Sequence, residues 1–118
     1  MKHFTSKTQK TGEIGEERAC MFLVKQGFSV IERNVANKFG EIDIVAKKGD
    51  TFHFFEVKTG KRGGFINPAE NLTKEKLRKL FISVAHYCLL KGIMKYKIQG
   101  VLVVLDGEVG VVEIIDLS

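Results

Sequence analysis

One stretch of sequence, residues 41–59, decides the fold of this chain and reads EIDIVAKKGDTFHFFEVKT. Its two halves, 41–48 and 51–59, alternate apolar and polar residues and are rich in strand-forming types. Between them, Gly49-Asp50 is typical of a two-residue turn. Because such a turn fixes which residues face each other, the stretch predicts an antiparallel hairpin of defined register.

The turn at 49–50 pairs residues that lie at equal distances from it: Lys48 with Thr51, Val45 with Phe54, Asp43 with Glu56, and Glu41 with Lys58. Side chains alternate between the two faces of a strand, so the charged pairs share a face with Val45 and Phe54. Directly opposed side chains have Cβ atoms roughly 5 Å apart. The register therefore predicts that the carboxylates of Asp43 and Glu56 meet beside Lys58.

Opposed carboxylates allow two interpretations, and the spacing alone leaves both open. A divalent cation would neutralise them, because Mg²⁺ prefers oxygen ligands and is held by one or two carboxylates; Lys58 would then polarise a water for attack on phosphorus. Alternatively the charges form a solvated strand end, in which Lys58 pairs with Glu41. Glu16, in an acidic helix start, either complements the helix dipole or reaches this end of the hairpin.

The segments before the hairpin predict a helix and a strand. Apolar residues recur at helical spacing from about Gly12 to Gln26, and Gly27 suits the position just past a helix end. Residues 28–34 (FSVIERN) alternate like a strand. Residues 1–10 are polar and are expected to be loose.

The segments after the hairpin predict a second helix and a second hairpin. Asn67-Pro68-Ala69-Glu70 is typical of a helix start, with a break expected near 71–73. An apolar stripe then runs from Leu77 to Leu89 and ends near Gly92. Two β-branched runs, 97–105 and 108–117, flank Asp106-Gly107, a hairpin signal. The predicted order is α-β-β-β-α-β-β, an α/β fold with a mixed sheet flanked by helices.

Composition limits the class of protein. The 118 residues, 44% hydrophobic with one proline, fit a single domain spanning 1–118. A formal net charge of +5 favours a polyanionic partner such as nucleic acid. Cys20 and Cys88 lie in apolar helical patterns and are expected to be reduced core thiols. The sequence shows no signal peptide or membrane span, so a cytoplasmic protein is expected.

Three motifs of this chain together resemble the YraN-like family of uncharacterised proteins: Gly12-x-x-Gly15-Glu16-x-x-Ala19, Gly40-Glu41-Ile42-Asp43-Ile44-Val45-Ala46, and Phe55-Glu56-Val57-Lys58. Asn67-Pro68 and Thr73-x-x-Lys76 also match, so the resemblance covers nearly the whole chain. That family is similar to the restriction-endonuclease-like PD-(D/E)xK superfamily and, within it, to the archaeal Holliday-junction resolvases. Ile42 stands where the name of the superfamily motif has proline.

The resemblance implies a restriction-endonuclease-like fold and a role for each matched residue. Asp43 and Glu56 would bind Mg²⁺ or Mn²⁺ together with the backbone carbonyl of Val57. Lys58 would assist the attacking water, and Glu16 would supply a supporting acid. Lys76 would face the site or the phosphates of the substrate.

The expected function is hydrolysis of phosphodiester bonds in nucleic acid. DNA is favoured over RNA as the substrate, and the enzyme would select the DNA by its structure. Lys61 and Arg62, in the glycine-rich loop 60–64, are predicted to contact the phosphate backbone, although the same loop also fits a solvated connection. The alternative is a catalytically silent nuclease fold that binds nucleic acid or protein. A homodimer is also expected, because so small a domain offers little surface to a branched or duplex substrate and because the resolvases work as dimers.

Overall fold

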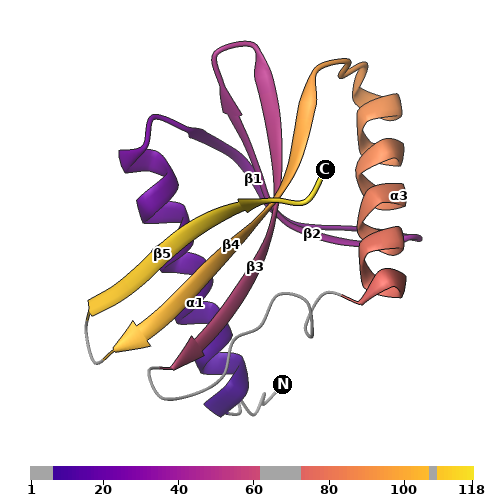
Figure 1. The fold of residues 1–118 in the computed structure, drawn as a ribbon. Helices are drawn as coiled ribbons and strands as arrows, with labels where there is room; N and C mark the ends of the chain where they lie inside the picture. Colours follow the sequence, from indigo (N-terminus) through magenta and orange to yellow (C-terminus); the bar gives the residue numbers. More distant parts are fainter. Residues whose placement is uncertain (1–6, 62–72, 107–108) are drawn as a thin grey trace, which may run out of the picture.

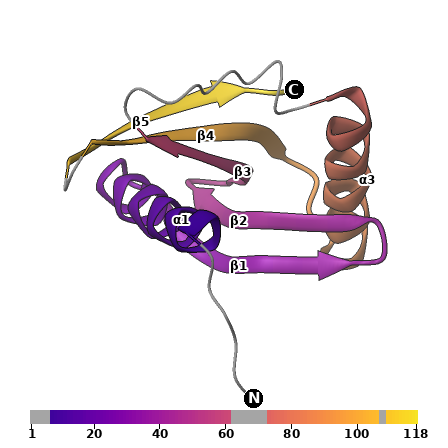
Figure 2. The same cartoon turned by 90° about the horizontal axis from the view of Figure 1, so that it is seen from below.

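A five-stranded sheet with the order β1-β2-β3-β4-β5 forms the centre of the protein, as seen in a computed structural model that describes residues 7–61, 73–106 and 109–118. Helix α1 covers one face of the sheet and helix α3 the other (Figures 1 and 2). The elements are α1 (Lys7–Lys25), β1 (Ser29–Asn37), β2 (Gly40–Lys48), β3 (Thr51–Lys61), α3 (Lys74–Lys91), β4 (Tyr96–Asp106) and β5 (Val109–Asp116).

The predicted α/β order and mixed sheet are confirmed. Strands β3 and β4 run parallel, and the other neighbouring strands run antiparallel. A parallel pair needs a crossover, and α3 lies in the connection between β3 and β4. This crossover puts α3 on the face opposite α1, so that both faces of the sheet are covered.

Helix α1 begins at Lys7, earlier than the Gly12 predicted, so residues 7–10 are helical rather than loose. Polar residues such as Lys and Gln have good helix propensity and need no apolar stripe to extend a helix. The end of the helix agrees with the prediction. Gly27 adopts φ 94°, and the N–H of Phe28 donates to the carbonyl of Leu23 at 3.0 Å, which is a glycine-based helix cap.

Strand β1 is longer than the predicted strand 28–34, because it forms a hairpin with β2 in which Asn37 pairs with Gly40. The Asn37 side chain holds this turn, since its Oδ1 accepts the N–H of Phe39 at 2.9 Å. The sequence prediction missed this hairpin because its signal lies in one asparagine side chain.

Helix α3 begins after Thr73, whose Oγ1 accepts the N–H of Lys76 at 3.2 Å. This cap coincides with the break expected near 71–73. The helix ends at Gly92, with φ 70°. The helix start predicted at Asn67-Pro68 lies outside the described residues.

The core has two layers, one on each face of the sheet. Between the sheet and α1, the buried residues include Ala19, Leu23 and Phe55. Between the sheet and α3 lie Phe54, Val84 and others. Both cysteines are buried and free, as predicted. Among the described residues, no helix is long and apolar enough to cross a membrane.

Candidate active site

The β2–β3 hairpin follows the predicted register only as far as it forms a backbone ladder. Lys48 pairs with Thr51 and Val45 with Phe54, and the ladder ends at the pair of Ile44 and Phe55. The prediction that Asp43 and Glu56, and Glu41 and Lys58, face each other as ladder partners is therefore wrong. These residues lie just beyond the point where the two strands separate.

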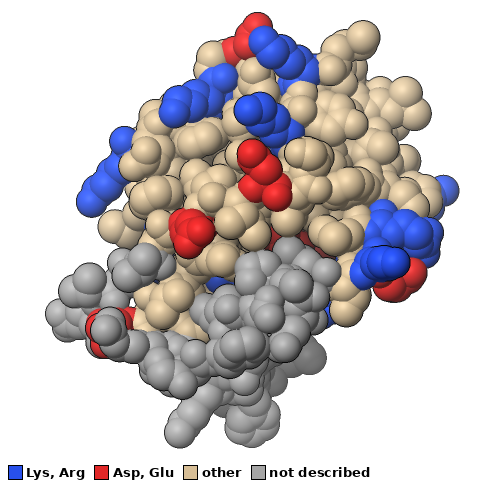
Figure 3. All heavy atoms as spheres, in the orientation of Figure 1, with Lys and Arg blue, Asp and Glu red and all other residues tan. Residues whose placement is uncertain are grey.

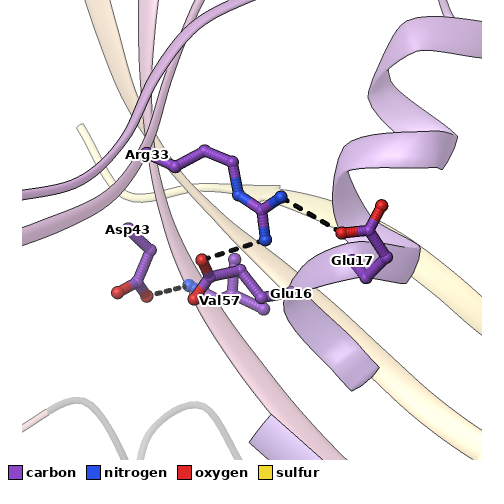
Figure 4. A network of polar contacts seen from close by, with 5 residues as sticks. All are labelled: Glu16, Glu17, Arg33, Asp43 and Val57. Carbon is purple, nitrogen blue, oxygen red and sulfur yellow. Dashed lines mark hydrogen bonds and ion pairs between the residues drawn. The ribbon is translucent and has the colours of Figure 1, made fainter. Parts of the chain in front are cut away.

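A twist in β2 explains where the ladder ends. Ile42 packs with Val45 in the layer under α3, although strict alternation would place it with Ile44 under α1. Asp43 lies at this change of face. Its Oδ2 accepts the backbone N–H of Val57 at 2.7 Å, so a side chain replaces the neighbouring strand as the partner of β3 (Figure 4).

This hydrogen bond orients the backbone of Val57. In a strand, the N–H and C=O of one residue point to the same side. The carbonyl of Val57, predicted as a metal ligand, therefore points toward the β2 side, where the Asp43 carboxylate lies. The twist thus brings a carboxylate and a backbone carbonyl to one place.

Asp43 and Glu56 do come together, as predicted, and the charge of Glu56 raises the cost of ionising Asp43. Burial, followed by the charge of Glu56, raises the pKa of Asp43 to about 7. Burial also raises the pKa of Glu56, whereas the charge of Lys58 acts to lower it. Perturbed carboxyl groups in contact with each other, beside a lysine, are typical of a functional site.

Lys58 lies at this pair rather than at Glu41. Its Nζ is 3.7 Å from Oε1 of Glu56, and the two side chains remain 25% and 20% exposed. The solvated-end alternative, in which Lys58 pairs with Glu41, does not match this geometry. The ammonium group of Lys58 therefore lies within reach of a ligand bound by the two carboxylates.

An open cleft of about 220 Å³ gives access to Glu56 and Lys58 from the α3 side. Glu56 and Lys58 form its β3 wall, and Lys76 and Lys79 line it from the first turns of α3. Lys76 therefore faces the site, as predicted, and its charge acts to lower the pKa of Glu56. Strand β2 contributes Glu41 and Gly40.

Glu16 reaches the site from α1. Its charge acts to raise the pKa of Asp43, while its Oε1 accepts a hydrogen bond from Nη2 of Arg33 at 3.3 Å. Arg33 also binds Glu17 at 3.1 Å, so one guanidinium from β1 holds both acids (Figure 4). The dipole interpretation of Glu16 is insufficient, because its carboxylate is 17% exposed and directed toward the sheet.

Sequence reasoning missed three residues of this site. Lys79 lies one turn after Lys76 and shares its side of the helix, a signal that the i, i+3 spacing contains. Glu41 was considered only as the partner of Lys58. Arg33 gave no sequence signal, because its role depends on β1 lying beside α1. The predicted contacts of Arg62 and of the Lys61 side chain lie outside the described residues.

The donor set suits a hard divalent cation. Asp43 and Glu56 supply carboxylate oxygens that burial leaves short of water, and Mg²⁺ is held by one or two carboxylates while it keeps several waters. In the part of the chain that the structure describes, no three His, Cys, Asp or Glu side chains cluster closely enough to enclose a metal. The residues therefore fit an open cation site completed by water, with Val57 as the backbone ligand.

Comparison with known protein families assigns this chain to one of them. A family model described as uncharacterised protein family UPF0102 matches residues 15–113, which include every acidic residue of the candidate site. The chain belongs to the UPF0102 family. The predicted resemblance to the YraN-like family is thereby confirmed.

The UPF0102 relatives match over most of their length. A UPF0102 protein of Nitratiruptor sp. is 39% identical over 82% of this chain and 85% of its own. One from Helicobacter hepaticus is 36% identical over 90% of this chain and 94% of its own. One from Sulfurovum sp. is 51% identical over 64% of this chain and 66% of its own.

A solved structure shares the fold of this UPF0102 protein. It is Hjc, a Holliday junction resolvase from the archaeal hyperthermophile Archaeoglobus fulgidus. The TM-score is 0.54 and the identity 18%, over 89% of this chain and 76% of that chain. At this identity the likeness establishes the restriction-endonuclease-like fold, as predicted, and leaves the activity to be argued from the site.

Proposed function

We propose that this UPF0102 protein hydrolyses phosphodiester bonds of DNA and requires Mg²⁺ or Mn²⁺. The observation that carries the proposal is the meeting of two partly buried carboxylates, Asp43 and Glu56, where Glu56 and Lys58 form the wall of a cleft. A structural domain gains nothing from placing Asp43, partly buried, beside Glu56, whose charge raises the pKa of Asp43. A phosphodiesterase needs such a pair to hold a cation.

Substrate binding is assigned to the lysines of the cleft. Lys76 and Lys79 lie one turn apart and can bind two phosphate oxygens as point charges. On the face shown in Figure 3, lysines and arginines stand in several separate groups. The phosphate contacts are expected at the cleft, because Lys58, Lys76 and Lys79 line it together.

Asp43, Glu56 and the carbonyl of Val57 would hold the cation. When bound, a divalent cation stabilises the charge that develops on phosphate oxygens and acidifies a water molecule. Lys58 donates hydrogen bonds to the attacking water and orients it, since its Nζ already lies beside Glu56. Glu16 acts as the supporting acid, in an orientation fixed by its hydrogen bond to Arg33.

DNA is the proposed substrate on two grounds. The fold neighbour Hjc is a Holliday junction resolvase, and the net charge of +5 suits a polyanion. A structure-selective enzyme would explain how a short cleft recognises its target without reading bases, because phosphate contacts position a protein without specifying sequence.

The test is a cleavage assay on four-way junctions, flapped, single-stranded and duplex DNA, and RNA, with Mg²⁺, Mn²⁺ or EDTA. We expect the wild-type chain to cut DNA only with metal, and Lys58→Ala and Asp43→Asn to slow cutting by about 100-fold or more. Asp50→Asn, at the exposed tip of the same hairpin, and the exposed Lys97→Ala are matched controls and should cut like the wild type.

Two outcomes would overturn the proposal. Cutting that survives both Lys58→Ala and Asp43→Asn would reveal a contaminating nuclease. Failure to cut any of these substrates with either metal would remove the enzymatic claim.

A second function, DNA binding without cutting, is favoured by one observation: Lys76 and Lys79 line the cleft, and both can bind phosphates without a cation. Binding of the same DNA that weakens steeply with salt, that Lys76→Ala and Lys79→Ala reduce, and that yields no product would support this function.

A further inference from the structure

Helix α1 is apolar on two opposite sides. Ala19 and Leu23 are fully buried against the sheet. On the outward side, three large apolar side chains follow the helical repeat and remain exposed: Ile14 at 47%, Met21 at 53% and Val24 at 58%. A helix that covers a single core needs one apolar side, so the second side points to another partner.

The outward side borders a groove of about 440 Å³ between α1 and β1. Cys20, Met21, Val24 and Val30 give it an apolar lining. Charged groups stand at its rim, among them Glu17 and Lys25. An apolar surface bordered by charges is typical of a protein interaction site.

The charges of this rim are arranged symmetrically around Met21. Glu17 lies one turn before Met21 on the helix, and Lys25 lies one turn after it. If a second α1 packs antiparallel with its own Met21 opposite the first, Glu17 of each copy meets Lys25 of the other. Glu17 remains 60% exposed although it binds Arg33, which leaves it accessible to a second cation.

We propose that this groove binds a second copy of the same chain, through antiparallel contact of the two α1 helices on a two-fold axis at Met21. Such an interface is self-complementary, as two-fold symmetry requires. Met21 and Val24 of one copy fill the groove of the other, and the two Glu17–Lys25 pairs fix the antiparallel direction. This homodimer surface does not depend on the proposed catalysis.

The dimer surface and the candidate active site lie on opposite sides of the sheet. The groove borders α1, whereas the cleft of the candidate active site borders α3, and the two share no lining residue. Figure 2 shows α1 and α3 on opposite faces of the sheet. Both copies therefore keep an open cleft in the dimer, and the interface can be tested apart from activity.

Symmetry provides the sharpest test, because a residue on the two-fold axis meets its own counterpart. In the full chain, Met21→Cys should form an intermolecular disulfide rapidly under mild oxidation. Met94→Cys is the matched control: Met94 is an apolar residue, 93% exposed, in the connection between α3 and β4, and it should cross-link slowly. Equal rates for the two variants would overturn the proposal.

Sedimentation over a dilution series gives a second test. The wild-type chain should show a concentration-dependent dimer, and Val24→Glu should shift it to monomer while Met94→Glu leaves it unchanged. Val24 is exposed in the monomer, so the variant is expected to fold, and circular dichroism checks this. A wild type that is monomeric at every concentration would exclude a second copy as the occupant.

Charge reversal tests the direction of packing. Lys25→Glu would place two carboxylates face to face twice in the dimer and should weaken association roughly tenfold. Adding Glu17→Lys to the same chain restores opposite charges across the interface, although it removes the Glu17–Arg33 ion pair within each copy, and should recover part of the lost affinity. If the double variant is weaker than Lys25→Glu alone, the antiparallel arrangement is wrong.

Discussion

Asp43 carries a carboxyl group at a position where ionisation is costly. It is packed between strands that have just separated, it lies beside Glu56, and one backbone N–H compensates part of its charge. Burial and repulsion from Glu56 raise the pKa of Asp43, whereas the hydrogen bond from Val57 lowers it. Its pKa of about 7 shows that burial and repulsion win. In the metal-free protein, Asp43 is accordingly about half protonated at neutral pH.

The pH dependence of stability follows from that pKa. Because folding raises the pKa of Asp43 from 3.8 to about 7, the folded state binds the proton more tightly than the unfolded state. The stabilisation is complete below about pH 4 and is lost as the pH rises through about 7. In EDTA, the free energy of unfolding from urea titrations should therefore fall by roughly 2–3 kcal/mol between about pH 5 and about pH 8.

Asp43→Asn should remove most of that fall, since asparagine keeps an acceptor for the N–H of Val57 but does not ionise. Asp50→Asn is the control, because Asp50 is exposed and its ion pair with Lys95 lowers its pKa instead. If wild type and Asp43→Asn lose stability equally between the two pH values, the assignment of the shift to Asp43 is wrong.

Among the elements, the contact of α1 with β3 sets the position of the acidic residues. Gly15 lies directly against Thr59, and a Cβ at Gly15 would overlap the Thr59 side chain. The missing side chain lets the helix approach the strand, so that Glu16, the next residue, comes close to Asp43. Packing against Thr59 thus explains why residue 15 is a glycine.

Gly15→Ala should destabilise the protein. Overpacking costs about 1–3 kcal/mol, and the gain of about 1 kcal/mol in helix propensity offsets part of it. Gly12→Ala is the matched control in the same helix, because a Cβ there meets nothing within 4 Å; it should stabilise the protein by up to about 1 kcal/mol. Thermal unfolding of both variants measures the difference, and equal effects would contradict the close contact.

For the whole molecule, folding and cation binding should be linked. A ligand that binds the folded state raises the free energy of unfolding according to its concentration and affinity. The cation must replace the proton held by Asp43 and Glu56, so the effect should depend on pH.

Millimolar Mg²⁺ should raise the Tm of the wild type at about pH 8, and by less at about pH 5.5, where the pair keeps its proton. Differential scanning fluorimetry with Ca²⁺, Mg²⁺ and EDTA measures this. Asp43→Asn should show no Mg²⁺-dependent rise at either pH, whereas Asp50→Asn should behave as the wild type. An Mg²⁺ effect of equal size in Asp43→Asn would place the cation elsewhere.

Much of this protein could be predicted from its sequence because the signals are local. The turn Gly49-Asp50 and the alternation around it determine the hairpin, and Gly27 determines where α1 ends. The choice of Asp43, Glu56 and Lys58 as candidates also followed from one register and a family resemblance. In each of these features the residues lie a few positions apart in the sequence. Backbone geometry alone therefore fixes where they lie relative to one another.

The tertiary structure decided how those residues meet. The ladder stops at Ile44 and Phe55 because β2 twists as Ile42 turns toward α3, so Asp43 binds Val57 instead of facing Glu56 across a ladder. Arg33 and Lys79 join the site from elements distant in the sequence. Burial sets the pKa of Asp43, and burial is a property of packed layers. The sequence alone determined which groups are available, while the packing of two helices on a twisted sheet decided which of them lie together and how readily Asp43 ionises.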